Sequence, residues 1–154
     1  MKFIRNWRTE VFGLLVIVLI SGCTATSNVV LNPTETGRTF TSVYLVTHGG
    51  HSVDMDNAFR KALMQRGLKV TEGETEPQTK STDLVVKYDD TWRWDIAMYL
   101  LSLDVQIYDS KTGALVAESE WHNSPAHTWP NVDTVVGQLM QQTFNKLNAK
   151  TPLP

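Results

Sequence analysis

AMYLLSLDVQIYDSKTGALVAESEW, residues 97–121, is the most regular segment of the chain and sets the class of its fold. From Leu101 to Tyr108 the sequence alternates between aliphatic residues and polar or aromatic ones. A repeat of two residues predicts a β-strand with one buried face and one solvated face. Asp109 to Gly113 then forms a glycine-containing turn, and residues 114–121 form the returning strand. The segment therefore predicts a long antiparallel hairpin.

On either side of this hairpin, strand-like and helix-like segments alternate. The further expected strands are residues 43–47, 68–71 and 83–88, and the expected helices are residues 54–66 and 132–148. Both helical segments carry their apolar residues on one stripe, which is typical of helices that cover a sheet. The order β-α-β-β-β-β-α predicts an α+β domain over residues 43–154. We expect a mainly antiparallel sheet of about five strands with two amphipathic helices on one face.

Residues 24–42, TATSNVVLNPTETGRTFTS, differ in composition from the predicted domain. They are rich in Thr, Ser and Asn, and such a segment buries little apolar surface. We therefore predict a flexible tether over residues 23–42. Residues 29–31, VVL, are the exception, because they have the character of a short strand that could pair onto a sheet edge.

The first 23 residues combine positive charge, a short apolar run and a cysteine. Lys2, Arg5 and Arg8 precede the run VFGLLVIVLI at residues 11–20. As a helix, ten residues reach about 15 Å, roughly half of a bilayer core, so the run predicts a signal peptide over residues 1–22. The motif that follows, Ile20-Ser21-Gly22-Cys23, resembles the lipobox of bacterial lipoproteins.

This resemblance implies transfer of diacylglycerol to the Cys23 sulfur, cleavage between Gly22 and Cys23, and acylation of the new amino terminus by a fatty acid such as palmitate. The alternative interpretation is a buried cysteine after an uncleaved helix. Thr24 follows the cysteine, with no Asp in that place. In enterobacterial sorting this resembles a lipoprotein destined for the outer membrane and facing the periplasm.

Charge and cysteine content exclude several classes of function. The chain has 14 Lys and Arg against 16 Asp and Glu, a net charge of −2. Removal of residues 1–22 takes away three cations and one anion, which changes the net charge to −4. Such a domain has no basic field to attract nucleic acid. One cysteine can form neither an intramolecular disulfide nor a cysteine-based zinc site.

A second resemblance covers residues 43–148. The strand Asp83-Leu84-Val85-Val86-Lys87-Tyr88 and the turn Asp109-Ser110-Lys111-Thr112-Gly113, followed by a strand that ends in Trp121, resemble small uncharacterised bacterial envelope lipoproteins. The layout is also similar to the N-terminal domain of the Tol system's propeller protein. These motifs consist of turn and strand chemistry, so the resemblance implies a fold and no catalytic residues.

His48-Gly49-Gly50-His51 is the feature of the sequence most typical of an enzyme. Two histidines three residues apart are weak candidates for a shared metal, but a metal site needs a third ligand as well. The His-Gly-Gly element also resembles the oxyanion loop of esterases, yet the chain has no G-x-S-x-G nucleophile elbow. We favour a glycine-rich connection between a strand and a helix, with solvated histidines. A hydrolase dependent on metal or histidine is the alternative.

Tryptophan and arginine supply the candidate residues for partner binding. In an extended Trp92-Arg93-Trp94 segment both indoles lie on one face and the guanidinium lies on the other. Trp and Arg are frequent anchors of protein interfaces, and Trp129 between Thr128 and Pro130 is a further candidate. The competing interpretation, which we prefer for Trp92 and Trp94, is that the rings pack at the end of the sheet or over the core, because Trp is usually highly buried.

Together these features predict a lipid-anchored module, facing the periplasm, for binding or assembly, with no catalysis and no cofactor beyond the lipid on Cys23. Its expected partners are the membrane, through the anchor, and an envelope protein or the cell wall. Nucleic acid is not expected. A structural envelope lipoprotein without a specific partner is a further alternative.

Overall fold

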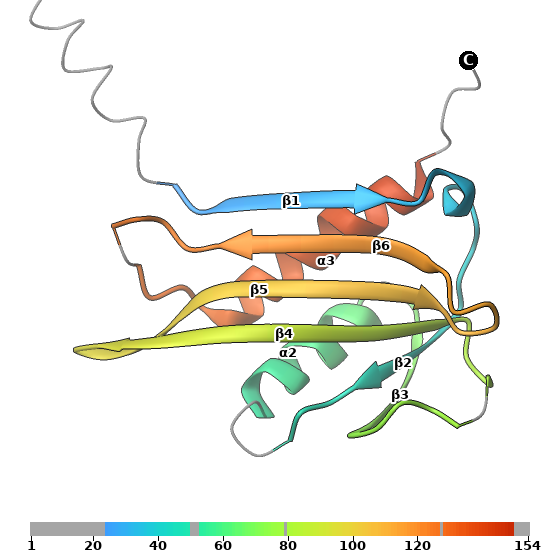
Figure 1. Ribbon diagram of the computed structural model, residues 1–154, viewed down its shortest axis with the longest axis horizontal. Helices are drawn as coiled ribbons and strands as arrows, with labels where there is room; N and C mark the ends of the chain where they lie inside the picture. The colour runs from blue at the N-terminus through green and yellow to red at the C-terminus, as the bar shows by residue number, and fades with distance from the viewer. Residues whose placement is uncertain (1–23, 50–52, 79, 127, 150–154) are drawn as a thin grey trace, which may run out of the picture.

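The computed structural model describes residues 24–49, 53–78, 80–126 and 128–149. Two layers make up the domain: a six-stranded sheet, and two helices that cover one of its faces (Figure 1). The strands are β1 (Thr26–Leu31), β2 (Ser42–Val46), β3 (Lys69–Gly73), β4 (Leu84–Asp95), β5 (Ala97–Asp109) and β6 (Leu115–His122). The helices are α2 (Val53–Met64) and α3 (Val132–Asn148), and a 3₁₀ turn, η1, spans Pro33–Glu35.

The strand order in the sheet is β1-β6-β5-β4-β2-β3. β1 with β6, β6 with β5, and β5 with β4 are antiparallel pairs, whereas β2 runs parallel to both β3 and β4. The predicted α+β class, the mainly antiparallel sheet and the two helices on one face are therefore confirmed. The sheet has one strand more than the five expected, because β1 is added at its edge.

The core lies between the helices and the sheet face that they cover. Apolar side chains at every second position of β4, β5 and β6 enter it, as the period of two predicts. Side chains with almost no exposure include Leu45, Phe59, Leu63, Tyr88, Leu103, Ile107, Leu139 and Met140. The opposite face of the sheet, called the open face below, has no helix over it (Figure 1).

Residues 26–38 correct the predicted tether, because they belong to the folded domain. Val29 is buried in the core, and the Lys146 Nζ atom donates a hydrogen bond of 3.0 Å to its carbonyl oxygen. Gly37 N donates to Leu147 O at 2.8 Å. The Thr-, Ser- and Asn-rich composition misleads here because an edge strand needs only one apolar face, and residues 29–31 supply it. The strand expected at residues 29–31 is thus confirmed and is longer than expected.

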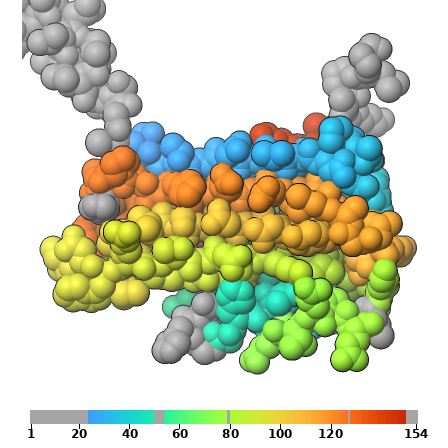
Figure 2. Space-filling model, in the orientation of Figure 1, coloured from blue at the N-terminus to red at the C-terminus, as the bar shows by residue number. Residues whose placement is uncertain are grey.

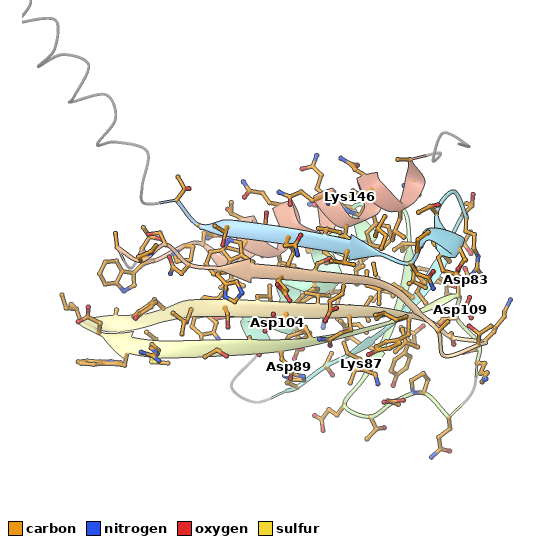
Figure 3. The ribbon with its side chains drawn as sticks, turned by 45° about the horizontal axis from the view of Figure 1, so that its top comes forward. Asp83, Lys87, Asp89, Asp104, Asp109 and Lys146 are labelled. Carbon is orange, nitrogen blue, oxygen red and sulfur yellow. The ribbon has the colours of Figure 1, made fainter. Side chains whose placement is uncertain are left out.

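The β5–β6 turn is held by Asp109, which is 2% exposed. Its Oδ1 accepts hydrogen bonds from the backbone N–H of Thr112 at 2.8 Å and of Lys111 at 2.9 Å. Gly113 adopts a φ of +74°, which glycine reaches without steric cost. The predicted glycine-containing turn is confirmed, and Figure 3 shows Asp109 beside Asp83 at one end of the sheet.

At the other end of the sheet, β4 and β5 run beyond their neighbours. Thr26 of β1 lies opposite His122 of β6, and His122 lies opposite Ser102 of β5, so β1 and β6 stop at this level. β4 and β5 continue as a two-stranded hairpin that projects past β1 (Figures 1 and 2). No helix among the described residues is both long and apolar enough to cross a bilayer.

Candidate functional site

The projecting end of the β4–β5 hairpin exposes large apolar side chains. Trp94 is 72% exposed, Ile96 83% and Met98 56%. Trp94 and Met98 are direct cross-strand partners, so their side chains share one face, and Ile96 lies in the turn between them. We call these three residues, with Trp129, the hairpin-end surface. Exposed apolar side chains that adjoin one another mark contact sites more often than isolated ones do.

The hairpin turn carries backbone strain. Ile96 has a φ of +42° and is the one described residue other than glycine with a positive φ. This region is a steric outlier for a β-branched residue. Strained residues persist where the surrounding structure holds them, and they are concentrated at functional sites. Here the strain places an isoleucine at the outermost point of the hairpin, almost fully in solvent.

Trp92 supports this surface rather than forming part of it. Its ring is partly buried against the core, and its indole N–H donates to the Asp90 carboxylate. A β-bulge between Thr91 and Trp92 shifts the register, so that Trp92 faces Leu100 on β5. The preferred interpretation that both Trp92 and Trp94 pack at the end of the sheet or over the core therefore holds for Trp92 and is wrong for Trp94.

Trp129 lies at the same end of the molecule in the loop between β6 and α3, and it is 52% exposed. Its ring packs edge-on against Tyr99, with centroids 6.3 Å apart. Tyr99 pairs with Arg93, so Trp129 adjoins the face of the hairpin opposite to Trp94. The structure thus places Trp94 and Trp129 at the same end of the molecule but on opposite faces of the hairpin, and the exposed Arg93 lies on the face that Trp129 adjoins.

Two asparagines hold the loop that carries Trp129. The Asn123 Nδ2 atom donates to Leu100 O at 2.8 Å and to Thr128 O at 2.7 Å, which ties the loop to β5. After Trp129, the Asn131 side chain caps α3 by accepting from Thr134 N at 3.0 Å. Trp129 is therefore presented by a braced loop.

Ile96 and Met98 belong to this surface although the sequence analysis did not single them out. The sequence predicts a strand that begins at residue 97, which puts Ile96 in a connection and Met98 on an ordinary strand position. A signal was present, since residues 92–98 read WRWDIAM, with apolar side chains at every second position. Because no long polar turn separates the two strands, Trp94, Ile96 and Met98 all lie near the tip, whereas Trp92 packs against the core.

The His48 loop has a structural role in the described residues. Asp56, 5% exposed, accepts hydrogen bonds from the backbone N–H groups of His48 at 3.2 Å and Gly49 at 3.1 Å. It also accepts from the Tyr88 hydroxyl. Burial and the Asp56 carboxylate raise the pKa of Tyr88 above its usual range.

The His48 ring stacks on Tyr88, with centroids 4.4 Å apart. Its Nδ1 atom lies 3.7 Å from the Asp90 carboxylate. Among the described residues, no group of three or more His, Cys, Asp or Glu is placed to hold a metal ion. His51 lies outside the described residues, so the alternative of a metal shared by the two histidines is untested.

The open face of the sheet carries a row of carboxylates. Asp89, Asp104 and Glu120 are direct neighbours across β4, β5 and β6. Figure 3 shows Asp89 and Asp104 side by side in the middle of these strands. Like charges placed directly opposite one another disfavour the sheet slightly and give this face a negative potential.

A shallow cleft of about 360 Å³ lies at the end of the sheet opposite to the hairpin-end surface. Its lining includes Lys87, whose ammonium pairs with Glu76 and lies 5.0 Å from the centre of the Tyr108 ring. The charged groups of the cleft thus already have partners in the protein. The hairpin-end surface, whose apolar side chains face solvent, is the stronger candidate for an interaction.

The predicted lipidation site lies just outside the described residues. Gly22 and Cys23 precede Thr24, where the described chain begins, and β1 starts at Thr26. The register of β1 places Thr26 at the end of the sheet from which the β4–β5 hairpin projects. The chain therefore enters the domain at the same end as the hairpin-end surface.

No protein-family model matches this chain, and no curated protein sequence matches it. Two solved structures of PelC from Paraburkholderia phytofirmans, both dodecamers and one of them a substituted variant, are similar in fold. Their TM-scores are 0.55 and 0.54 at 15% and 14% identity, over 83% of this chain and 100% of theirs. At such identity the likeness shows a shared fold alone.

Two further solved structures have lower TM-scores. A PDZ domain protein from Parabacteroides distasonis gives 0.48 at 13% identity, over 79% of this chain and 36% of that protein. TolB from Acinetobacter baumannii gives 0.42 at 13% identity, over 76% of this chain and 31% of TolB. A Tol-system protein is thus among the similar structures, as the resemblance in sequence implied, but scores this low do not establish a common fold.

Proposed function

We propose that the chain is a bacterial envelope lipoprotein, acylated on Cys23, whose domain acts as a periplasm-facing module for binding or assembly. The hairpin-end surface is the contact surface of this module. One observation carries the proposal: Trp94, Ile96 and Met98 stand exposed on a strained hairpin that extends beyond the rest of the sheet. The proposal assigns no catalytic role to the chain.

The chemistry of this surface suits binding. Tryptophan offers a large rigid ring at low entropic cost and is enriched among the residues that contribute most to interfaces. Trp94 is held on a paired strand, and Trp129 lies on a loop that the Asn123 side chain holds in place. Both side chains therefore lose little conformational entropy when a partner binds. A surface that is ordered before contact loses less entropy on binding.

The lipid on Cys23 supplies the second part of the mechanism. One acyl chain holds a protein only marginally at a membrane, whereas two or more anchor it stably. An anchored domain meets other components at the same membrane at a raised effective concentration, without any added contact. Thr24 after the cysteine supports placement in the outer membrane.

Two experiments in bacterial cells test this proposal. Labelling with a fatty acid should mark the protein, and Cys23→Ser should abolish the label and leave unprocessed precursor. The proposal of a lipoprotein is refuted if the wild-type protein carries no label.

A photo-crosslinking amino acid at position 94 should capture an envelope component, whether protein, cell wall or lipid. Position 64 is the matched control, because Met64 is 59% exposed on the helix α2, away from the hairpin. Equal capture from positions 94 and 64 would argue against a dedicated contact surface.

A further inference from the structure

The start of β1, three residues after Cys23 in the sequence, and the hairpin-end surface lie at the same end of the domain, and the strand register gives their relative positions along the strands. Thr26 of β1 pairs with His122 of β6, and His122 pairs with Ser102 of β5. Ser102 in turn pairs with Thr91 of β4, so Thr26 and Thr91 lie at the same position along the strand direction. From Thr91 the strand β4 continues to Asp95. At about 3.3 Å per residue, these four steps place the tip about 13 Å beyond the start of β1.

The chain between Cys23 and the sheet is too short to carry Cys23 beyond the tip of the β4–β5 hairpin. Cys23 precedes Thr26 by three residues, which span at most about 10 Å when fully extended. Along the strand direction, Cys23 therefore extends at most about 10 Å beyond Thr26, whereas the tip extends about 13 Å. Sideways, β1 is three strand spacings from β4, about 14 Å. Acyl chains on Cys23 thus enter a bilayer close beside the hairpin.

The side chains at the tip match the interface of a bilayer. Trp94 and Trp129 are exposed indoles, and tryptophan is enriched where hydrocarbon meets headgroups. Ile96 in the turn and Met98 opposite Trp94 add exposed apolar groups at the tip. Arg93 and Asp95, the charged residues flanking Trp94, cancel in net charge, so the tip does not repel anionic headgroups.

The charges on the open face disfavour contact between that face and a membrane. The open face carries Asp89, Asp104 and Glu120 in one row across the sheet, with Glu118 nearby on β6. Pressing this face onto phosphate headgroups would bring like charges together. A domain that stands on its hairpin end keeps the carboxylates in water.

We propose that the occupant of the hairpin-end surface is the lipid bilayer that holds the Cys23 anchor. The β4–β5 tip enters the headgroup region and, with the acyl chains, fixes the orientation of the domain. The open face and the helices then face the periplasm at a defined angle. This inference rests on the proposed lipoprotein function, since an unacylated chain has no reason to meet the membrane at this end.

The experiment uses the acylated protein, purified from bacterial membranes and reconstituted into vesicles of phosphatidylethanolamine and phosphatidylglycerol. A fraction of the lipids carries bromine on the acyl chains near the headgroups, where it quenches nearby tryptophans. The processed chain contains Trp92, Trp94, Trp121 and Trp129, of which Trp121 is 7% exposed inside the domain. We expect bromine to quench the wild-type fluorescence, and Trp94→Phe with Trp129→Phe to remove most of that quenching.

Ile96→Asp is a second variant, which places a charge at a position that is 83% exposed and so leaves the fold intact. It should reduce the quenching strongly, while Met64→Asp, an equally drastic change on α2, should leave it unchanged. Absence of bromine quenching in the acylated wild-type protein would overturn the inference. So would quenching that persists undiminished in both tip variants.

The possible outcomes distinguish contact of the tip with the bilayer from the lipoprotein function on which it rests. If purified protein carries no fatty acid, the lipoprotein function fails, and the inference fails with it. If the protein is acylated, position 94 crosslinks to another protein and bromine does not quench, the binding module stands and the bilayer as its occupant is refuted. Crosslinks from position 94 to lipid, together with bromine quenching, support both.

Discussion

Replacing Asp109 by asparagine should destabilise the domain by about 3 kcal/mol at neutral pH, although the two side chains have nearly the same volume. The Asp109 carboxylate closes the β5–β6 turn and also accepts a hydrogen bond of 2.8 Å from Arg38. The backbone N–H of Thr112 is the main cause of a lowered pKa, with further contributions from Arg38 and the Thr112 hydroxyl, and burial opposes them. Together they lower the pKa of Asp109 to about 2.

The magnitude follows from the difference between the folded and unfolded states. An aspartate in an unfolded chain has a pKa of about 3.9, and one pKa unit corresponds to about 1.4 kcal/mol. The lowered pKa of Asp109 is therefore worth about 3 kcal/mol of stability when the carboxylate is charged. Because the pKa is lower in the folded state, this stability is fully present above about pH 4 and is lost as the pH falls towards 2.

Urea unfolding of the purified chain, followed by circular dichroism, measures the effect. At pH 7, Asp109→Asn should lower the free energy of unfolding by about 3 kcal/mol, which for a domain of this size lowers Tm by about 8–13 °C. The difference from wild type should shrink between pH 4 and pH 2. Asp95→Asn is the control, since Asp95 is exposed, and it should stay within about 0.5 kcal/mol of wild type. Equal stability of Asp109→Asn and wild type at pH 7, or a difference that does not depend on pH, would refute the reasoning.

Three further substitutions test the packing. Gly137→Ala in α3 should raise the free energy of unfolding by up to about 1 kcal/mol, because an added Cβ meets nothing within 4 Å and glycine is a poor helix former; thermal melting would show no gain if this space is filled. Gly73→Ala should instead cost about 1–3 kcal/mol, because its Cβ would overlap the Tyr44 hydroxyl, and an unchanged Tm would contradict that contact. Lys146→Ala should lower the free energy of unfolding by about 1 kcal/mol and speed amide hydrogen exchange in β1, because it removes the hydrogen bond from Lys146 Nζ to Val29 O. Exchange in β1 at the wild-type rate would count against this role.

Much of the fold could be predicted because its signals are local. The β5–β6 hairpin rests on alternation over neighbouring residues and on the Asp109–Gly113 turn, and both act within a few positions of the chain. β1 was placed in a tether because its pairing partner β6 lies about ninety positions away in sequence. The extension of β4 as far as Asp95 is hard to predict because Asp90 is polar at the position where the apolar alternation of Leu84, Val86 and Tyr88 would continue.

The candidate site divides in the same way. The sequence analysis selected Trp94 and Trp129 by residue type, but it could not tell that Trp94 is exposed and Trp92 is packed against the core. That difference depends on how far the helices extend along the sheet. The sequence does not predict the exposure of Ile96, because that exposure follows from a strained turn between two long strands.

The sequence by itself determined the class of the fold, the central hairpin and the predicted lipid anchor, because each depends on a pattern within a few consecutive residues. Only the tertiary structure decided that the start of β1, the β4–β5 tip and the Trp129 loop meet at one end of the domain. Those three segments are far apart in the chain. Their meeting is set by the antiparallel register of β1, β6, β5 and β4, which long-range strand pairing selects and no local pattern specifies.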